Sequence, residues 1–177
     1  MRVVMSGMFV LLVSAVAVFA QDVPKHATSK GVTAEIINAQ GQNVGTATFL
    51  ESPKGVKIKL DIKNLPPGPH LMHIHEFAKC EPPDFKSAGA HFNAAGSEHG
   101  EHNHTGMAAG DIPNFVLTVN ADGTAHTSVI APGVSLGTES NSVFSNGGTA
   151  LVIHAVAAEV SASAPPRIAC AVITKPS

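Results

Sequence analysis

The sequence predicts an all-β domain, an antiparallel sandwich or barrel of eight strands. Short runs of alternating apolar and polar residues recur along the chain, and Gly- and Pro-containing turn signals separate them. No stretch after the first twenty residues keeps a helical period. The 177 residues, 44% hydrophobic and 14% charged, suffice for one compact domain and are too few for two ordinary ones.

The first segment is predicted to be a secretory signal peptide over residues 1–20. Arg2 supplies a positive charge, residues 8–19 are almost wholly apolar, and small residues precede a cleavage site after Ala20. A membrane-spanning helix is the alternative, but an apolar run of about 12 residues is shorter than the ~20 that spanning needs.

The exported chain would then have a flexible leader over residues 21–30 and a folded domain over residues 31–177. We expect it to be secreted or periplasmic, with no membrane attachment after cleavage. Loss of Arg2 takes the formal charge from −2 to −3, so no basic surplus exists to neutralise phosphates. Trp and Tyr are absent, which leaves little for stacking on bases. Both observations argue against a nucleic-acid partner.

Eight runs are predicted strands. In Val56–Lys63 aliphatic residues alternate with Lys and Asp, as in a strand with one buried and one solvent face. The other runs are Val32–Asn38, Val44–Glu51, His70–Phe77, Asn114–Val119, Thr124–Ile130, Ala150–Ala155 and Ile168–Thr174. Residues 78–110 carry no strand pattern, and a loop of that length in a compact domain is usually functional.

Histidine is the compositional outlier, with ten in the chain, eight of them within residues 70–126. His73 and His75 lie two apart in a predicted strand, so their side chains point to the same face. His91 follows in the long loop, and His154 ends a predicted strand. Three or four imidazoles suit Cu(II), Zn(II) or Fe, and the sequence therefore predicts a metal site.

The two cysteines, Cys80 and Cys170, indicate one disulfide in an exported chain. Two metal-binding thiolates are the alternative, which their wide separation disfavours.

Five motifs occur in order along the chain: His70–Glu76, Lys79–Asn93, Gly110–Asn114, Val152–Ala155 and Pro166–Ile173. With them the chain resembles the copper/zinc superoxide dismutases of the bacterial secreted type, over nearly all of residues 31–175. The resemblance implies an eight-stranded Greek-key β-barrel, an immunoglobulin-like sandwich with a long metal-binding loop and one disulfide. This agrees with the strand count.

The resemblance also implies roles for single residues. Four histidines match the copper ligands: His73, His75, His91 and His154. Two further positions match zinc ligands that would act with His91: His99 and Asp111. His91 matches the histidine that bridges both metals and delivers a proton to the product. Cys80 and Cys170 match the family disulfide, and Arg167 matches the arginine that guides the superoxide anion.

Three departures from the family pattern concern zinc and the approach to copper. Ala108 stands where the family has its third zinc-only histidine, three residues before Asp111. His102 or His104 is a possible substitute ligand, the alternative being that both are solvated loop residues. Ala158 replaces an aspartate that links the two metal sites, with Glu159 next to it.

The third departure is a short loop before Arg167. Residues 155–166 number twelve and include one charge, so weaker electrostatic steering is expected. Together the departures resemble the copper-only branch of the family. The expected cofactor is copper, with zinc bound weakly or not at all.

The expected function is disproportionation of superoxide to O₂ and H₂O₂, with copper cycling between Cu(II) and Cu(I). A non-enzymatic extracytoplasmic copper carrier or buffer on the same fold is the alternative. Retention of the four copper positions and of Arg167 favours the enzyme. His70 is expected to support the copper strand, and His126 to face solvent. The family contains monomers and dimers, so a homodimer is one of the open arrangements.

Overall fold

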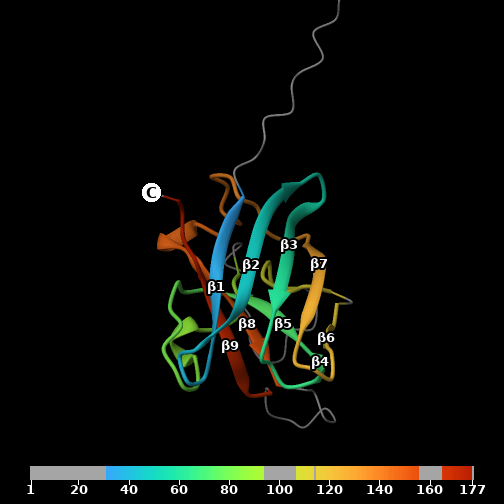
Figure 1. Cartoon of the computed structure of the whole chain (residues 1–177). Helices are drawn as coiled ribbons and strands as arrows, with labels where there is room; N and C mark the ends of the chain where they lie inside the picture. Colours follow the sequence, from blue (N-terminus) through green and yellow to red (C-terminus); the bar gives the residue numbers. More distant parts are fainter. Residues whose placement is uncertain (1–30, 94–106, 114, 156–164, 177) are drawn as a thin grey trace, which may run out of the picture.

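The computed structural model describes residues 31–93, 107–113, 115–155 and 165–176, and strands dominate it (Figure 1). The strands are β1 (Val32–Asn38), β2 (Asn43–Ser52), β3 (Gly55–Ile62), β4 (Gly68–His70), β5 (Met72–His75), β6 (Leu117–Val119), β7 (Ala125–Ala131), β8 (Thr149–His154) and β9 (Arg167–Ile173). Two 3₁₀ turns lie in loops: η1 (Lys86–Ala88) and η2 (Ser145–Gly147). The predicted all-β fold class is confirmed. The predicted signal peptide and leader lie outside the described residues.

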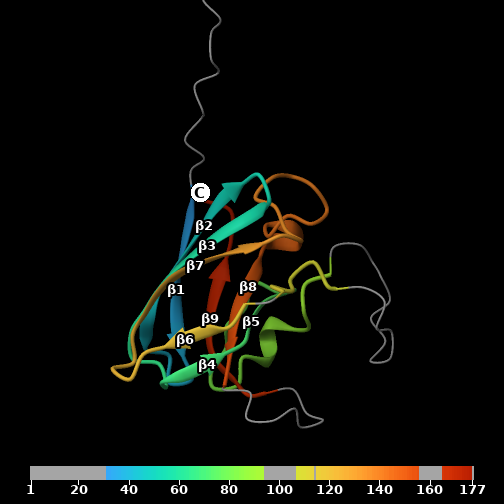
Figure 2. The same cartoon turned by 90° about the vertical axis from the view of Figure 1, so that its right-hand side faces the viewer.

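The strands form two antiparallel sheets. Seven pair in the order β5-β8-β9-β1-β2-β3-β7, and β4 pairs with β6. Figures 1 and 2 show the large sheet curled into a half-barrel. Within the described ranges, no helix is both long and apolar enough to span a membrane.

One predicted strand is divided in the structure. The run His70–Phe77 was expected to be a single strand, but the chain changes sheets at Leu71, so β4 pairs with β6 and β5 pairs with β8. The burial alternation continues through the change, with His70 and Met72 both buried on either side of Leu71. Corners of β-sandwiches are made by strands that switch sheets in this way. In the described residues, nine strand segments therefore replace the eight predicted ones.

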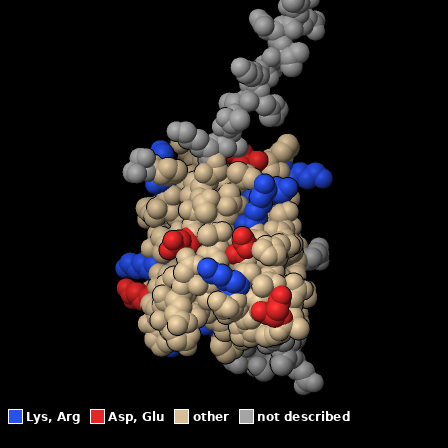
Figure 3. Space-filling model, in the orientation of Figure 1, with Lys and Arg blue, Asp and Glu red and all other residues tan. Residues whose placement is uncertain are grey.

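The main core lies inside the curled sheet. On β3 the side chains of Val56, Ile58, Leu60 and Ile62 are all at most 3% exposed. Their neighbours on the outward face are charged, and Figure 3 shows Lys and acidic side chains side by side there. The strict alternation of this strand is thus explained by a sheet with one buried face and one solvent-exposed face.

A second, smaller core lies on the other side of β8. Phe85, Ala88, Ala150, Val152 and Cys170 are all fully buried in it. The loop that carries η1 covers this side of β8, which explains why all six residues of β8 are buried (Figure 2).

The predicted disulfide is present and fastens this loop. Cys80 is bonded to Cys170 on β9, with their Cα atoms 5.7 Å apart. The long loop after β5 is thereby attached to the strand that begins with Arg167.

Candidate metal centre

The histidine group is built around β5. His73 and His75 lie opposite Val152 and Ala150 of β8. On the free edge of β5, the Phe92 N–H donates to the Ile74 carbonyl at 2.8 Å, and His75 forms a bridge with His91. The long loop thus returns along β5 and places His91 beside the two strand histidines.

Gly110 completes this edge. The Ile74 N–H donates to its carbonyl at 2.9 Å, and its own N–H donates to the Phe92 carbonyl at 2.8 Å. A Cβ at this position would collide with the Ile74 carbonyl oxygen, so only glycine allows the close approach. The next residue, Asp111, is thereby brought to His91.

His154 enters at the end of β8. The register between β8 and β9 shifts between Ile153 and His154, and the His154 N–H donates to the Leu71 carbonyl at 2.9 Å. Such irregularities re-aim side chains next to functional sites. Here His154 points toward the β5 histidines.

The four predicted copper ligands come together as one group. One ring nitrogen from each of His73, His75, His91 and His154 lies within 4.8 Å of those of the other three. The His73 and His91 rings stack with centroids 4.1 Å apart, and His154 meets His73 edge-on at 5.2 Å. A single ion can be held by this arrangement.

The hydrogen bonds of the rings define which nitrogens face the centre. His75 Nδ1 lies 2.9 Å from the Gly89 carbonyl, and His154 Nδ1 lies 3.1 Å from the Pro165 carbonyl. Because a carbonyl only accepts, each Nδ1 carries the proton and each Nε2 keeps a free lone pair.

Three buried ring nitrogens have no hydrogen-bond partner in the part of the chain that the structure describes: His73 Nδ1, His75 Nε2 and His154 Nε2. Buried polar atoms without partners are rare in proteins and call for an explanation such as a bound ion. With His91 Nε2, they form a four-nitrogen donor set of the kind that suits copper, zinc or iron.

Burial keeps these rings neutral. Desolvation, followed by repulsion from His91 and His154, lowers the pKa of His73 to about 4. Desolvation likewise lowers the pKa of His75 to about 3 and is the main cause that lowers the pKa of His154. The metal-binding lone pairs are therefore available at neutral pH without loss of a proton.

Asp111 holds the second nitrogen of His91. Its Oδ1 accepts the proton of His91 Nδ1 at 2.8 Å, and its Oδ2 accepts the Ala108 N–H at 2.8 Å. Protonation at Nδ1 directs Nε2 of His91 toward the group. A carboxylate that accepts from a ligating imidazole is the usual partner of such a ligand.

Arg167, the first residue of β9, lies beside the group. Its Nη1 donates to the Phe85 carbonyl and its Nη2 to the Gly89 carbonyl, both at 2.7 Å. The Gly89 carbonyl therefore accepts from both His75 and Arg167, which joins a ring of the group to the guanidinium.

Other predicted residues have simpler surroundings. Both ring nitrogens of the buried His70 lie 2.8 Å from carbonyl oxygens, those of His154 and Pro66, as expected for structural support. His126 is exposed on β7, 3.2 Å from Asp61. The remaining zinc-related positions, His99, His102, His104, Ala158 and Glu159, lie outside the described residues.

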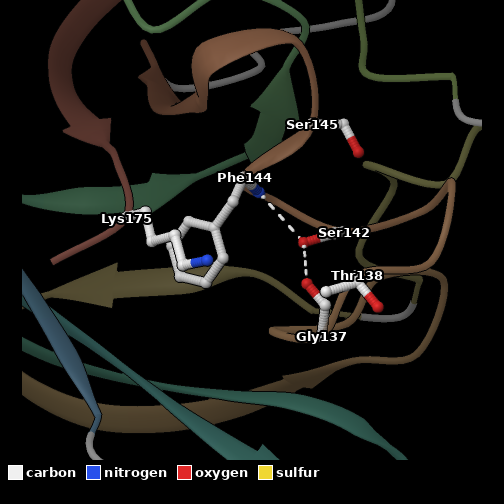
Figure 4. A pocket seen from close by; sticks show the side chains of 6 residues that line it. All are labelled: Gly137, Thr138, Ser142, Phe144, Ser145 and Lys175. Carbon is white, nitrogen blue, oxygen red and sulfur yellow. Dashed lines mark hydrogen bonds between the residues drawn. The ribbon is translucent and has the colours of Figure 1, made fainter.

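A separate hollow of about 250 Å³ lies in the loop between β7 and β8 (Figure 4). The Ser142 hydroxyl at its centre donates to the Gly137 carbonyl and accepts the Phe144 N–H. The Ser145 hydroxyl donates to the Ser140 carbonyl. The hydroxyl groups of Ser142 and Ser145 therefore serve the loop itself, and none of the four histidines lines the hollow.

Comparison with known proteins identifies the family. The copper/zinc superoxide dismutase (SODC) family model matches residues 43–173. The chain belongs to the copper/zinc superoxide dismutase family. Superoxide dismutase [Cu-Zn] 2 of Aquifex aeolicus is 44% identical over 169 residues, 92% of each chain. Superoxide dismutase [Cu-Zn] of Caulobacter vibrioides is 40% identical over 126 residues, covering 70% of this chain and 71% of the relative.

Solved structures of the family have the same fold. A double mutant of a SOD-like protein from Bacillus subtilis matches with a TM-score of 0.69 and 34% identity, covering 81% of this chain and 97% of that one. Cu/Zn superoxide dismutase from Brucella abortus matches with a TM-score of 0.62 and 28% identity, covering 81% and 99%.

Sequence reasoning missed the residues that act through their backbone. Gly89 and Pro165 fix two rings by their carbonyls, and a carbonyl has no signature in sequence. The one signal in the sequence is that residue 89 is glycine, which suits the left-handed backbone found there, with φ +77°.

Proposed function

We infer that this chain is a superoxide dismutase that converts superoxide to O₂ and H₂O₂. The inference rests on the buried ring nitrogens of His73, His75 and His154, which have no hydrogen-bond partner among the described residues and converge with His91. Arg167, held by two carbonyl oxygens, lies beside them. Its relatives named superoxide dismutase support the same activity.

Copper bound by the four histidines would supply the one-electron change that oxidises one superoxide and reduces a second, which takes up two protons. Imidazole ligands suit both oxidation states of copper. The donor set fits a metal ion. His75 and His154 each have Nδ1 held by a carbonyl oxygen, which leaves Nε2 for the metal, and Nδ1 of His73 is buried without a partner among the described residues.

Arg167 would attract and orient the substrate anion. Its guanidinium is charged at every relevant pH and is held by two carbonyl oxygens, so it has a defined position. A copper carrier has no need for such a group. This favours the enzyme over the carrier or buffer.

We propose that copper binds alone and that zinc binds weakly or not at all. Ala108 offers no ligand where the family has a histidine. His91 Nδ1 and Asp111 Oδ1 also contact each other directly at 2.8 Å. Two ligands of a tetrahedral zinc, each about 2.0–2.1 Å from the ion, would lie about 3.3 Å apart. Zinc would have to break this hydrogen bond and remove the His91 proton.

The proposal extends to location. Residues 1–20 would direct export, cleavage would follow Ala20, and the disulfide fits an oxidising compartment outside the cytoplasm.

The decisive experiment is superoxide turnover by residues 21–177, loaded with copper in zinc-free buffer. Fast, cyanide-sensitive turnover with one copper and no zinc per chain is expected. A tightly held zinc beside copper would contradict the copper-only proposal. One bound copper per chain without turnover would favour the carrier. Activity that returns on addition of zinc would instead indicate that His102 or His104 completes a zinc site.

A further inference from the structure

The peptide unit between Gly89 and Ala90 lies where the long loop returns to β5. Gly89 has φ +77° and ψ −153°, a combination that only glycine adopts readily. Glycine has no Cβ to restrict ψ, and this angle sets how the following peptide plane is rotated. The direction of the Gly89 carbonyl is therefore set mainly by the hydrogen bonds of the peptide unit itself.

The carbonyl end of this peptide unit serves the histidine group. Its oxygen accepts from His75 Nδ1 at 2.9 Å and from Arg167 Nη2 at 2.7 Å. Because both bonds meet on one atom, a rotation of the plane would carry the oxygen away from both donors at once. The orientation of one peptide therefore affects a metal-binding ring and the guanidinium together.

The N–H end of the same peptide unit is held by Glu76, the residue that follows His75. The Ala90 N–H donates to Glu76 Oε1 at 3.1 Å, and the Glu76 N–H donates to the Ala90 carbonyl at 3.0 Å. In a regular antiparallel pair of residues, both bonds would join backbone atoms. Here the side chain of Glu76 takes the place of its own carbonyl as the acceptor.

The geometry of the peptide bond couples these two ends. In a trans peptide the N–H and the C=O lie in one plane and point in opposite directions, so a bond that holds the N–H also aims the carbonyl. Hydrogen bonds in a chain also strengthen one another, so donation by the N–H makes the carbonyl a better acceptor. The Glu76 side chain lies against this unit, because a Cβ at Gly89 would collide with its Cγ and Oε1.

We propose that Glu76 is a positioning residue of the histidine site: by holding the Ala90 N–H, it aims the Gly89 carbonyl at His75 and Arg167. The proposal rests on the proposed dismutase function only where turnover is measured. Glu76 is half-buried and Ala90 is exposed, so water can replace part of the lost bond when the carboxylate is removed. Its removal should therefore loosen both donors without unfolding the chain.

The test compares Glu76→Ala and Glu76→Gln with a matched control, Glu51→Ala. Glutamine keeps an oxygen that can accept from the Ala90 N–H. Glu51 Oε1 also accepts a backbone N–H, that of Leu136, but Glu51 lies on β2, a strand that contributes no histidine to the group. Its replacement removes the same side chain and the same kind of hydrogen bond.

The first readout is the NMR signal of the His75 Nδ1–H proton in the Cu(I)-loaded chain, since Cu(I) is diamagnetic. His154 Nδ1 donates to a different carbonyl, that of Pro165, and its proton is the reference within the same spectrum. In Glu76→Ala the His75 signal should move upfield and exchange with water several times faster, while the His154 signal stays in place. Glu76→Gln and Glu51→Ala should leave both signals near their wild-type positions.

The second readout is copper affinity, measured by chelator competition, together with superoxide turnover. Because one carbonyl serves the ring and the guanidinium, Glu76→Ala should weaken copper binding about threefold and slow turnover about two- to threefold. These changes are smaller than the 10–100-fold typical when the direct partner of a ligand is removed. Glu76→Gln should stay near the wild type in both, and so should Glu51→Ala.

Three results would overturn the proposal. One is an unchanged His75 signal in Glu76→Ala. Another is an equal change of the His75 and His154 signals, which would indicate general loosening. The third is a Glu76→Gln variant that behaves like Glu76→Ala, because the hydrogen bond would then not be the cause. If the wild type fails to turn over superoxide, the dismutase function fails, and the His75 signal still decides the role of Glu76.

Discussion

Replacement of Asp111 tests the proposed copper centre closely, because both oxygens of this side chain are in use. Oδ1 accepts from His91 Nδ1 and Oδ2 from the Ala108 N–H. Asp111→Ala removes both acceptors. Asp111→Asn offers one amide oxygen to two donors, so either the His91 hydrogen bond or the turn at residue 108 is lost.

The expected loss is in copper affinity. Removal of the group that orients a ligating imidazole typically weakens metal binding 10–100-fold, or about 1.4–2.7 kcal/mol. The lower end applies to Asp111→Ala, because the His91 side chain is 40% exposed and water can replace the carboxylate as acceptor. We therefore expect a roughly tenfold higher dissociation constant.

The assay is a chelator competition for Cu(II) in zinc-free buffer, so that loss of a zinc site cannot account for the result. Asp61→Asn is the matched control, since Asp61 also pairs with a histidine, His126, but on the exposed face of the large sheet. Wild-type copper affinity in Asp111→Ala would refute the reasoning, because His91 would then be oriented without its carboxylate.

Three other outcomes are expected. Cys80→Ser with Cys170→Ser removes a cross-link with a sequence separation of 90, so the chain-entropy model gives a loss of about 4–5 kcal/mol and a melting point about 10–15 °C lower by calorimetry; a drop of about 2 °C would contradict it. Arg167→Lys keeps the charge but not the two-carbonyl fork, and superoxide turnover should fall by on the order of tenfold; an unchanged rate would show that charge alone suffices. The metal-free protein should lose stability as pH falls below 6.5. Burial lowers the pKa of His73 to about 4 and that of His75 to about 3 from the ordinary value of 6.5, so below pH 6.5 the unfolded chain binds more protons than the fold. Below pH 6.5, the melting temperature of His75→Gln should depend less on pH than that of the wild type. Equal pH dependence of the two melting temperatures would contradict the lowered pKa of His75.

The sequence predicted what depends on side-chain patterns. Alternation in Val56–Lys63 predicted a half-buried strand, and β3 is one. The spacing of His73 and His75 placed both side chains on one strand face, and both lie in the histidine group. These two predictions hold because a strand repeats every two residues wherever it lies in the fold. The family resemblance, and not the alternation, added His91 and His154 to the set.

Sheet changes and backbone acceptors could not be predicted in this way. The break at Leu71 leaves the burial pattern intact, so nothing in the alternation reveals it. The carbonyls of Phe85 and Gly89 orient Arg167 through atoms that every residue has.

The shared carbonyl of Gly89 has a consequence for how such a protein can diverge. A single oxygen serves the metal-binding ring of His75 and the anion-attracting Arg167. A lineage that gave up catalysis and lost the arginine would also release one restraint on a metal ligand. In such a descendant the Gly89 carbonyl would keep the His75 contact and lose the Arg167 one, so a change in anion attraction would also change how firmly a metal-binding ring is held.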